Sequence, residues 1–391
     1  MTPTSLASPG LRHLVLLGAG HAHVHVLQGL AKSRPADLHI TVIAPYPRQL
    51  YSGMVPGFVA GHYALDQCVI PLAGLLARCG AHYIEGSGVA IDADAKTVTL
   101  ASGQTVEWDW LSVNTGPVMD REKIESAMLG AREHALFVRP IETFGALWPL
   151  VAELAKSRPI ELAVIGAGAA GLELAMGAAH ALRGAGYPEG SRVTLVTGGP
   201  PPASSYSPAL RRRVLLALQR QQIRVVRSAC VGMAAGEVQL ADGSILACDV
   251  PLLAVGAQAP GWLAGSGLAL DEAGFVAVNR YQQSTSHSCI FAAGDVASRI
   301  DAPHPRSGVY AVRAGPPLLA NLQAAVRGQP LKPYQPPART LSLISCGECY
   351  AIAAWGGLHV EGGWVWRLKD WIDRGFVARY ATPGKAGQPI S

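Results

Sequence analysis

The sequence predicts an α/β protein built from two Rossmann-like units, followed by a small C-terminal α+β region. A glycine-rich turn between an apolar strand and a helix begins at Gly18, and a second turn of the same kind begins at Gly166. A third apolar run ends in the pair Gly294-Asp295. Strand–turn–helix units of this kind assemble into parallel sheets with helices on their faces, so the duplication predicts two such sheets in one chain.

The first unit lies at the start of the chain. The continuous apolar run Arg12–Leu17 predicts a parallel strand that is buried on both faces. A turn and helix over Gly18–Leu30 and a strand over Leu38–Ala44 complete a βαβ opening. Short strand-like pieces separated by turn signals follow over residues 81–100, and a further short strand is expected over Trp110–Asn114.

The second unit repeats this order. A strand over Glu161–Ile165 leads through the second glycine turn into a helix over Leu172–Leu182, and the next strand is expected over Arg192–Thr197. Ser207-Pro208 is typical of the N-cap and first position of a helix, which is predicted to run to Arg220. The remaining strands of this sheet are expected over Ile223–Val226 and Val250–Val255.

Composition and charge narrow the function classes. With 49% hydrophobic and 15% charged residues, the chain can bury sizeable cores. The net charge of +5 comes without a basic block interleaved with aromatic residues, so nucleic acid binding is not expected. No stretch reaches the roughly 18–20 apolar residues that a spanning helix needs, and no signal peptide is expected before the first strand.

The seven cysteines are odd in number and scattered, which does not suit a disulfide framework, so a cytoplasmic setting is expected. Cys346 and Cys349 form the one close pair, and we interpret them as small residues at a strand end. His21, His23 and His25 alternate on the first turns of a helix, where alternate side chains do not share a face. No metal site is therefore expected.

The second glycine turn has the complete glycine pattern of a dinucleotide site. Gly166 permits the tight turn, Gly168 lets the backbone approach a pyrophosphate, and Gly171 allows the helix to pack closely on the strand. The helix N-terminus then directs its N–H groups at the anion. The next strand ends in Thr197-Gly198, where an acidic residue usually holds the ribose, and Arg211–Arg213 lies on the following predicted helix. NADH and NADPH therefore both stay open.

The first glycine turn departs from this pattern because His23 stands at its third position and no acidic residue ends the next strand. A distant motif supports it nevertheless. Cys289–Ala297 is interpreted as a short strand that ends in Gly294-Asp295 before a helix, which is the second fingerprint of an FAD site. The aspartate would accept hydrogen bonds from the ribityl chain, and the helix N-terminus would face the phosphates. Thr115-Gly116 and Val255-Gly256 are interpreted as sharp turns between the two units.

These elements, in this order, resemble the two-dinucleotide flavoproteins of the pyridine nucleotide-disulfide oxidoreductase superfamily over the whole chain. The sequence is similar to type II NADH dehydrogenases, and especially to the FAD-dependent module found fused to selenide, water dikinases. The motifs that carry this closer resemblance are Gly20–His23, Tyr51–Gly57, Ala60–Tyr63, Gly308–Pro317 and Trp366–Asp373. The resemblance implies that NAD(P)H passes a hydride to FAD, which then reduces a quinone-like or other acceptor.

The resemblance also implies a division into domains. Residues 11–120 and 258–330 are expected to form a discontinuous FAD-binding domain, and residues 121–257 an NAD(P)H-binding domain. The Pro-rich segment Gln329–Pro337 then leads into a C-terminal interface or membrane-association region over residues 331–391.

Site residues follow from the same resemblance. Glu173 matches an acidic residue near the nicotinamide, although an ordinary first-turn helix carboxylate explains it equally well. Tyr310 lies on the helix expected to face the flavin where a quinone docks, and we assign both residues a catalytic role. The expected FAD contacts are Gly18, Gly20, His21, Ala22, Tyr51, Ser52, Met54, Val89, Thr115, Gly116, Gly294 and Asp295. The expected nicotinamide-dinucleotide contacts are Gly166, Gly168, Gly171, Thr197 and Gly256.

Two other functions stay open. One is a non-turnover flavoprotein, such as a redox sensor or an electron-delivery partner linked to selenium metabolism, because acidic residues are missing at both ribose positions. The other is an enzyme like the sulfide:quinone reductases, which need widely spaced redox cysteines such as Cys230 with Cys346.

The segment Trp364–Tyr380 is predicted to form an amphipathic, aromatic and basic helix. Its aromatic residues are Trp364, Trp366, Trp371 and Phe376, and its basic residues are Arg367, Lys369, Arg374 and Arg379. Such a helix is typical of peripheral docking on the inner face of the cytoplasmic membrane. Packing on the FAD-binding domain, or on a second subunit in a homodimer, is equally compatible with this pattern.

Overall fold

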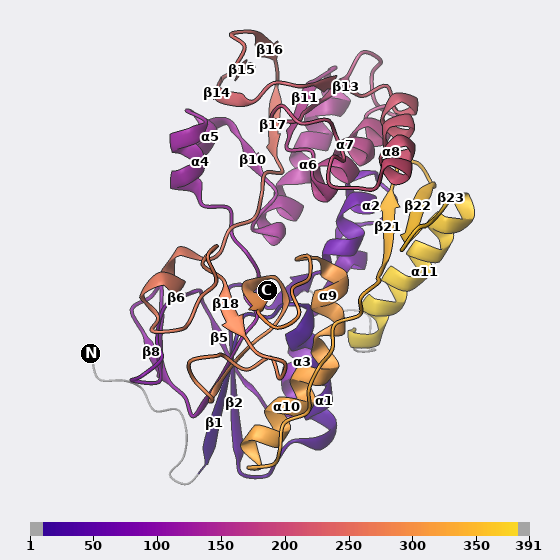
Figure 1. Cartoon of the computed structure of the whole chain (residues 1–391). Helices are drawn as coiled ribbons and strands as arrows, with labels where there is room; N and C mark the ends of the chain where they lie inside the picture. Colours follow the sequence, from indigo (N-terminus) through magenta and orange to yellow (C-terminus); the bar gives the residue numbers. More distant parts are fainter. Residues whose placement is uncertain (1–10, 382–391) are drawn as a thin grey trace.

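The first sheet is parallel, and its five strands have the order β19-β9-β1-β2-β5. Its strands are β1 (Arg12–Leu17), β2 (Leu38–Ala44), β5 (His82–Glu85), β9 (Trp110–Val113) and β19 (Ile290–Ala292). The computed structural model describes residues 11–381 and places this sheet in the lower half of Figure 1. Nearly every residue of β1 and β2 is buried, as their apolar sequences predict. Helix α1 (His21–Ser33) follows β1 and packs against α3 (Ala73–Cys79) and α10 (Gly315–Val326).

The second sheet is also parallel, with the order β10-β17-β11-β12-β13. Its strands are β10 (Leu136–Phe137), β11 (Glu161–Ile165), β12 (Arg192–Val196), β13 (Arg224–Val226) and β17 (Val250–Leu253). Helices α6 (Ile141–Ser157), α7 (Ala169–Ala181) and α8 (Pro208–Arg220) lie with it in the upper half of Figure 1. The Ser207 hydroxyl accepts a hydrogen bond from the Leu210 N–H at 3.4 Å, so the predicted cap of α8 is confirmed.

A small antiparallel sheet accompanies each parallel sheet, and each pair encloses its own apolar core. The first consists of β6 (Gly88–Asp92), β7 (Thr97–Leu100) and β8 (Thr105–Glu107), and the second of β14 (Cys230–Ala234), β15 (Glu237–Leu240) and β16 (Ile245–Ala247). The other short elements are β3 (Arg48–Leu50), β4 (Val69–Pro71), β18 (Val276–Val278), β20 (Ala297–Arg299), α2 (Val55–Val59), α4 (Arg121–Ala127) and α5 (Ala131–His134), with 3-10 turns at Ser52–Met54, Leu65–Cys68, Gly261–Gly265 and Gly294–Val296.

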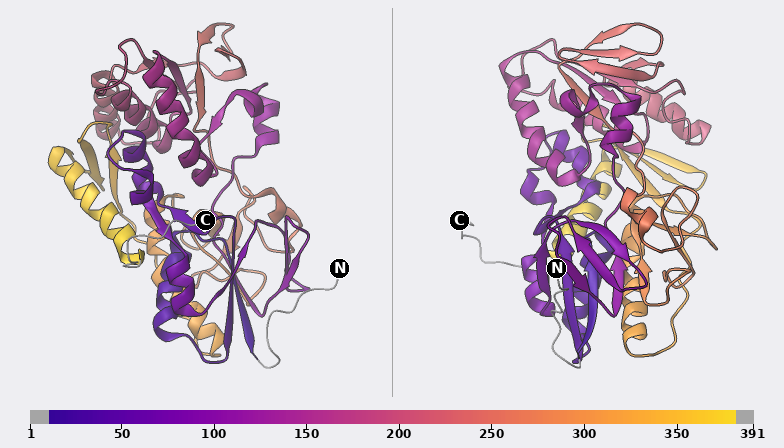
Figure 2. Two further views of the ribbon diagram at one scale, coloured as in Figure 1. Left: turned by 180° about the vertical axis from the view of Figure 1, so that it is seen from behind. Right: turned by 90° about the vertical axis from the view of Figure 1, so that its left-hand side faces the viewer.

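The C-terminal module, residues 341–380, touches both halves of the molecule. Its antiparallel strands β21 (Leu341–Ser345), β22 (Ala351–Trp355) and β23 (Leu358–Gly362) pack against helix α11 (Gly363–Tyr380). Figures 1 and 2 show this module on one flank, where β21 contacts α7 and β22 contacts α8, whereas α11 contacts α1 and β4. The final residues of the predicted C-terminal region, 382–391, lie outside the described residues.

The predicted α/β fold class is confirmed, but one predicted element is wrong. The sequence predicts a helix directly after Gly294-Asp295, whereas the structure has a 3-10 turn, the strand β20 and a loop. Helix α9 (Gly308–Arg313) begins only beyond this loop. Strand β20 forms because residues 297–299 pair in parallel with β18, with Val276 opposite Ala297 and Val278 opposite Arg299. Pro303 and Pro305 then favour an extended conformation in the loop that follows. No helix N-terminus therefore follows the Gly-Asp motif directly.

The chain returns to the first sheet after the second sheet is complete. Strand β19 pairs in parallel with β9, with Ile290 opposite Leu111 and Ala292 opposite Val113. Helices α9 and α10 then pack on α1. This return supports a discontinuous first domain, whose boundaries at residues 120 and 258 stay a prediction.

Candidate functional site

The first glycine turn is fixed by Asn114, which follows β9. Gly18 has a φ of +89°, and a Cβ there would lie 2.5 Å from the Asn114 carbonyl oxygen, so the position requires glycine. The Asn114 Oδ1 accepts hydrogen bonds from the N–H groups of Ala22 and His23 at 3.2 Å each. Its Nδ2 donates to the Ala293 carbonyl at 2.6 Å, which ties the turn to the end of β19. Sequence analysis missed Asn114, although its place just before Thr-Gly at a strand end was a usable signal.

His23 takes the place of the third glycine and is completely buried. Its Nδ1 lies 2.6 Å from the Gly18 carbonyl and its Nε2 lies 2.8 Å from the Ser112 hydroxyl. A carbonyl can only accept, so Nδ1 donates to Gly18. In the neutral ring that burial favours, Nε2 then accepts from the Ser112 hydroxyl. Burial accordingly lowers the pKa of His23 to about 4. In the second turn a Cβ at Gly171 would lie 1.9 Å from the Gly166 carbonyl oxygen, so α7 tolerates no side chain at the equivalent position.

The second glycine turn leaves open backbone where a dinucleotide is expected. Gly166 has a φ of +114°, and a Cβ there would meet the Ala254 carbonyl oxygen at 2.5 Å. By contrast, no heavy atom lies within 4 Å of a Cβ built at Gly168 or Gly256. Thr197 directly follows β12, and its buried Oγ1 has no hydrogen-bond partner among the described residues. The open glycine backbone fits the close approach of a pyrophosphate. The Thr197 hydroxyl lies beneath the surface at the strand end where the ribose is expected.

A charged group that no motif marks lies near the Gly-Asp pair. Burial raises the pKa of the Asp295 carboxyl, and the positive charge of Arg139 opposes this shift. Burial likewise lowers the pKa of the Arg139 guanidinium, with Asp295 and Glu142 acting in the other direction. Burial and then the Arg139 charge lower the pKa of His21 to about 4. Arg139 therefore shares one enclosed region with two of the expected FAD contacts.

Residues from three separate motifs meet around His21. Its Nε2 lies 3.3 Å from the Ser52 hydroxyl, and a Cβ at Gly308 would lie 3.5 Å from the same hydroxyl oxygen. The ring of Tyr51 lies 5.3 Å from the His21 ring and stacks on the ring of Phe376, with centroids 4.4 Å apart. The structure thus brings the first glycine turn, the Tyr51–Gly57 motif and the start of α9 together, and adds Phe376 from α11.

Glu173 lies where α7 meets the C-terminal module. Its Oε1 accepts a hydrogen bond from the Ser345 N–H at 2.7 Å, at the end of β21. Burial raises the pKa of the Glu173 carboxyl to about 7, although the Lys369 charge and the Ser345 bond act to lower it. The Glu173 charge in turn contributes to raising the pKa values of Tyr206 and Cys346, after burial. Glu173 is therefore enclosed at a junction of elements and is not a solvated first-turn carboxylate.

Lys369 and Asp373 form a buried ion pair one helical turn apart on α11. The Lys369 Nζ lies 2.6 Å from the Asp373 carboxylate and donates to the Gly53 carbonyl at 2.7 Å. Burial first, and then the charge of Asp373 and a hydrogen bond to it, raise the pKa of the Tyr51 hydroxyl. The sequence predicts an amphipathic helix here and leaves open whether it docks on a membrane or packs on the protein. In the structure, α11 turns Val365, Lys369, Asp373, Phe376 and Tyr380 inward.

The other expected site residues are distributed around the first glycine turn. A Cβ at Gly20 would lie 2.5 Å from the Asn114 Oδ1, whereas Gly116 has open space around it. Thr115 donates its hydroxyl to the Gly116 carbonyl at 3.3 Å, Met54 is buried in the main core, and Val89 is exposed on β6. Tyr310 stacks on His304 with ring centroids 4.3 Å apart, and its hydroxyl donates to the Pro337 carbonyl at 3.2 Å. This bond turns the Tyr310 hydroxyl toward the Pro-rich segment.

The structure does not bring together the cysteines that a dithiol mechanism needs. All seven are free, with Cys349 exposed. Cys346 belongs to the main core cluster, whereas Cys230 belongs to the core between the second sheet and its small antiparallel sheet. Within residues 11–381, no group of three or more His, Cys, Asp or Glu side chains is arranged to hold a metal ion.

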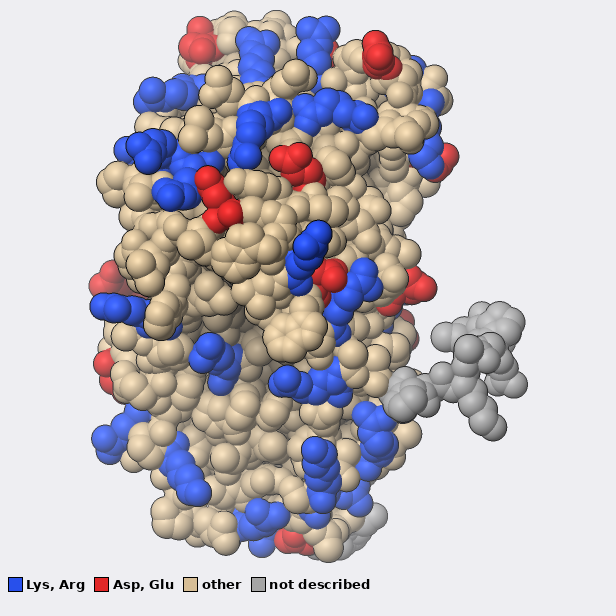
Figure 3. Space-filling model, turned by 90° about the vertical axis from the view of Figure 1, so that its right-hand side faces the viewer, with Lys and Arg blue, Asp and Glu red and all other residues tan. Residues whose placement is uncertain are grey.

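Exposed apolar side chains gather on the C-terminal module. Trp371 is 73% exposed and Trp364 is 57% exposed, seven residues apart on the outer face of α11. Exposed apolar residues of β22, β23 and α11 are Trp355, Leu358, Val360 and Ile372. On the face that carries this module, Lys and Arg are spread among uncharged residues, with fewer Asp and Glu (Figure 3). No helix in the described part of the chain is long and apolar enough to cross a membrane.

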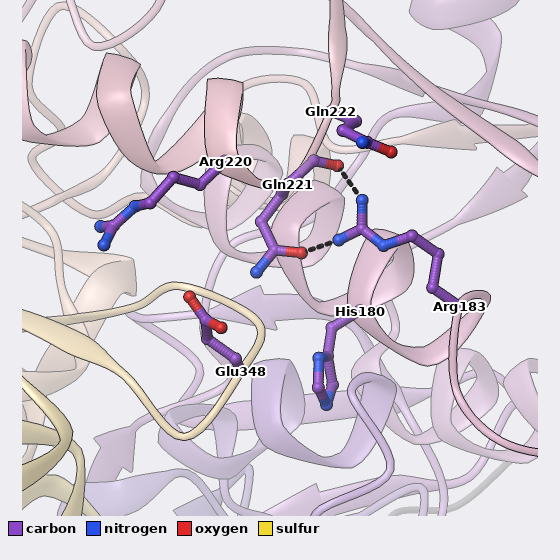
Figure 4. Close-up of a pocket in the computed structure, with 6 residues that line it drawn as sticks. All are labelled: His180, Arg183, Arg220, Gln221, Gln222 and Glu348. Atoms are coloured by element: carbon purple, nitrogen blue, oxygen red, sulfur yellow. Dashed lines mark hydrogen bonds between the residues drawn. The ribbon is translucent and has the colours of Figure 1, made fainter.

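A hollow of about 350 Å³ lies at the end of α7 opposite Gly168. Figure 4 shows the Arg183 guanidinium donating to the carbonyl and to the side-chain oxygen of Gln221. The Gln221 amide then donates to the Cys346 carbonyl at 3.0 Å. Glu348, from the turn before β22, lines the same hollow. These bonds connect α7 and α8 to the C-terminal module, away from the two glycine turns.

Known proteins resemble this chain in sequence and in fold. Over 308 residues it is 28% identical to an NADH dehydrogenase-like protein of Mycobacterium tuberculosis, covering 75% of each chain. It is 33% identical over 132 residues to the sulfide-quinone reductase of Aquifex aeolicus, a match that spans 32% of this chain and 30% of that relative. The solved sulfide:quinone oxidoreductase of the same organism superimposes with a TM-score of 0.77 at 21% identity, over 96% of this chain and 93% of that one.

The family model for pyridine nucleotide-disulphide oxidoreductases matches residues 12–315, which include both glycine turns, Asn114 and the Gly294-Asp295 motif. The predicted superfamily is therefore confirmed, whereas the closer resemblance to the module fused to selenide, water dikinases stays a prediction. On this match, and on the two Rossmann-like units that carry it, the chain belongs to the pyridine nucleotide-disulphide oxidoreductase family.

Proposed function

We propose that this oxidoreductase is an FAD-dependent NAD(P)H dehydrogenase that delivers electrons to a quinone-like acceptor. The observation that carries the proposal is the junction of Glu173, Lys369 and the segment Tyr51–Gly53, where both sheets and the C-terminal module meet. The names of the similar proteins, an NADH dehydrogenase-like protein and sulfide-quinone reductases, support the same class of reaction.

The residues around the first turn would hold FAD. His21, Ser52 and Gly308 meet there, and Asp295 with Arg139 supplies an enclosed carboxylate and guanidinium for polar groups of the cofactor. When bound, FAD accepts a hydride and releases electrons, while the protein supplies orientation and electrostatics. The open backbone of Gly168 and Gly256, with the unpaired Thr197 hydroxyl, would hold the nicotinamide dinucleotide.

Glu173 is proposed to supply a proton to the acceptor. A carboxyl whose pKa is about 7 exists in both protonation states near neutral pH, which suits a general acid. The Lys369 charge favours the ionised form, and the Ser345 N–H holds Oε1 in place. Tyr310 stays a candidate for contact with the acceptor, although its hydroxyl donates to Pro337.

The outer face of α11 is proposed to rest on a membrane surface. Trp364 and Trp371 project from it beside basic residues, a combination typical of helices that lie in the interface plane. The inner face of the same helix carries Lys369 and Phe376, which contact the segment Tyr51–Gly53, where we propose that the acceptor binds. A lipid-soluble quinone would thus need to pass only through this module to reach that place from the membrane.

A single variant separates the two proposed cofactor sites. The purified protein should carry non-covalent FAD and oxidise NAD(P)H with a short-chain quinone as acceptor. Gly168→Val should abolish this oxidation and keep the flavin spectrum, because a side chain there enters the open path to the backbone of the second turn only. Absorbance spectra and stopped-flow flavin bleaching measure the two effects independently.

The double variant Cys346→Ser, Cys349→Ser is the matched control and should bleach at close to the wild-type rate. Colourless protein that FAD cannot reconstitute would contradict the central proposal. Loss of FAD in Gly168→Val would instead show that the two turns are assigned the wrong way round. Sulfide oxidation that depends on Cys346 would favour the sulfide:quinone reductase alternative.

A further inference from the structure

The end of β12 lacks the group that would select an unphosphorylated ribose. In Rossmann units, an Asp or Glu at the end of the second strand holds the ribose 2′-hydroxyl of NAD and would repel a 2′-phosphate. Here β12 ends before Thr197, Gly198 and Gly199, and no acidic residue occurs from there to Ser205. The place next to the 2′ position is therefore free of negative charge from this loop.

A guanidinium lies at this place instead. The Thr197 N–H donates to the Val226 carbonyl at 3.0 Å, and the Gly198 N–H donates to the Ser228 carbonyl at 3.2 Å. These bonds place the C-terminal end of β13 beside the C-terminal end of β12. Arg227 lies between them, and its Nε approaches the Gly199 carbonyl at 3.5 Å. Within residues 11–381 this long contact is the only hydrogen bond or ion pair of the exposed Arg227 side chain, so its other nitrogens are available.

Arg213, the last residue of the basic triplet expected nearby, has a different use. Arg213 points its Nε at the Glu361 carboxylate of β23 at 3.9 Å and donates from its guanidinium to the Ala209 carbonyl at 3.4 Å. It therefore belongs to the contact between α8 and the C-terminal module. Thr197, by contrast, adds a buried and unpaired hydroxyl at the same strand end as Arg227. Arg227 therefore supplies an exposed cation at the end of this strand, and a phosphate monoester on a ribose satisfies such a cation.

We propose that the second nucleotide site selects a dinucleotide with a 2′-phosphate, NADPH, and that Arg227 is the residue that recognises this phosphate. The inference rests on the proposed function for the identity of the site, and it adds which of the two nicotinamide dinucleotides the site takes. A guanidinium binds a phosphate through charge-assisted hydrogen bonds, which are roughly twice as strong as neutral ones.

The first experiment compares kcat/KM for NADPH and NADH in steady-state oxidation. The wild-type protein should favour NADPH, and Arg227→Gln should lower kcat/KM for NADPH by roughly 10- to 100-fold, mainly through KM, and that for NADH by much less. Thr197→Asp should shift the preference toward NADH. Arg224→Gln, an exposed arginine at the other end of β13, is the matched control and should leave both values near wild type.

The second experiment needs no electron transfer. Adenosine 2′,5′-bisphosphate should raise the melting temperature of the FAD-loaded protein more than ADP does, and Arg227→Gln should remove this difference. A preference for NADH, or an Arg227→Gln variant that behaves like Arg224→Gln in both assays, overturns the inference. Selective binding of the bisphosphate without NADPH oxidation would support the inference and reject the proposed function, whereas neither binding nor oxidation rejects both.

Discussion

His23 stands where the glycine motif has its third glycine. A glycine there would only lie close to the carbonyl of the turn, whereas the His23 side chain forms a hydrogen bond with it. Its neutral ring donates to Gly18 and accepts from Ser112, so the turn is held by side-chain hydrogen bonds. The sequence pattern shows only that a glycine is missing at this position. A glycine motif specifies where small residues are needed, and it does not predict which hydrogen bonds a larger residue could form there. Asn114 escaped prediction for a similar reason: its partners Ala22 and Ala293 are distant in sequence.

His23 should make folding sensitive to acid. Its pKa of about 4 in the folded state lies below the ordinary value of 6.5, so the unfolded chain binds more protons between these values. Stability is therefore lost as the pH falls from about 6.5 toward 4, by roughly 2 kcal/mol at pH 5 from this residue. Urea unfolding of wild type and His23→Gly at pH 7 and pH 5 measures this difference.

The variant His23→Gly should be less stable at pH 7 by about 2–4 kcal/mol, since it loses two buried hydrogen bonds and leaves a cavity. Its loss of stability between pH 7 and pH 5 should be smaller than that of wild type. Ser112→Ala keeps the histidine and is the control, expected to retain the acid sensitivity. Equal acid sensitivity in wild type and His23→Gly would contradict the assignment.

Among the elements, α11 depends most on partners that its own sequence does not reveal. Period and composition predict an amphipathic helix over Trp364–Tyr380, and the helix is there. They do not predict that Lys369 is buried, because a lysine on a helix is usually solvated. Its burial is explained by Asp373, one turn along the same helix, and by the Gly53 carbonyl, which lies in position once two distant segments have packed together.

The Lys369–Asp373 pair provides a test of how α11 is anchored. Lys369→Met should destabilise the protein by about 3–5 kcal/mol, because it leaves a buried carboxylate and the Gly53 carbonyl without their partner. The double variant Lys369→Met, Asp373→Leu should recover part of this loss. Denaturant unfolding gives the energies, and limited proteolysis shows whether α11 is released.

Arg374 and Asp370 supply the matched control on the same helix. They form an ion pair with the same spacing at 2.8 Å, in which Arg374 is exposed and Asp370 is partly exposed and accepts a hydrogen bond from Tyr63. Arg374→Met should therefore cost at most about 1 kcal/mol. If the Lys369 and Arg374 variants lost equal stability, the buried pair would not be the anchor of α11.

For the whole molecule, the sequence predicts the elements that depend on a local residue pattern. It does not predict the contacts between segments that are distant in the chain. Most strands of both parallel sheets, and their glycine turns, follow from apolar runs and turn residues. The enclosure of Glu173 and the position of Arg139 do not, because each depends on packing between elements from different parts of the chain. The expected helix after Gly294-Asp295 is replaced by a strand because residues 297–299 pair with β18.

The proposed membrane contact depends on apolar side chains that are exposed on the surface of the whole molecule. Trp364→Ser together with Trp371→Ser should reduce sedimentation with phosphatidylglycerol-rich vesicles several-fold, since both side chains are more than half exposed on one helix face. Leu150→Ser, which removes a 65% exposed apolar residue from α6, is the control and should sediment like wild type. Unchanged vesicle binding in the double tryptophan variant would show that α11 does not dock.

The return of β19 to the first sheet has a consequence for how the chain matures during synthesis. Strands β1, β2, β5 and β9 emerge from the ribosome long before β19, which alone covers the outer edge of β9. At a translation rate of ~5–20 residues per second, that edge waits tens of seconds or less while the entire second sheet emerges. An uncovered strand edge is a template for pairing with other chains. The nascent protein is therefore most vulnerable to aggregation in this interval, and slower translation between the codons for Val113 and Ile290 prolongs the risk.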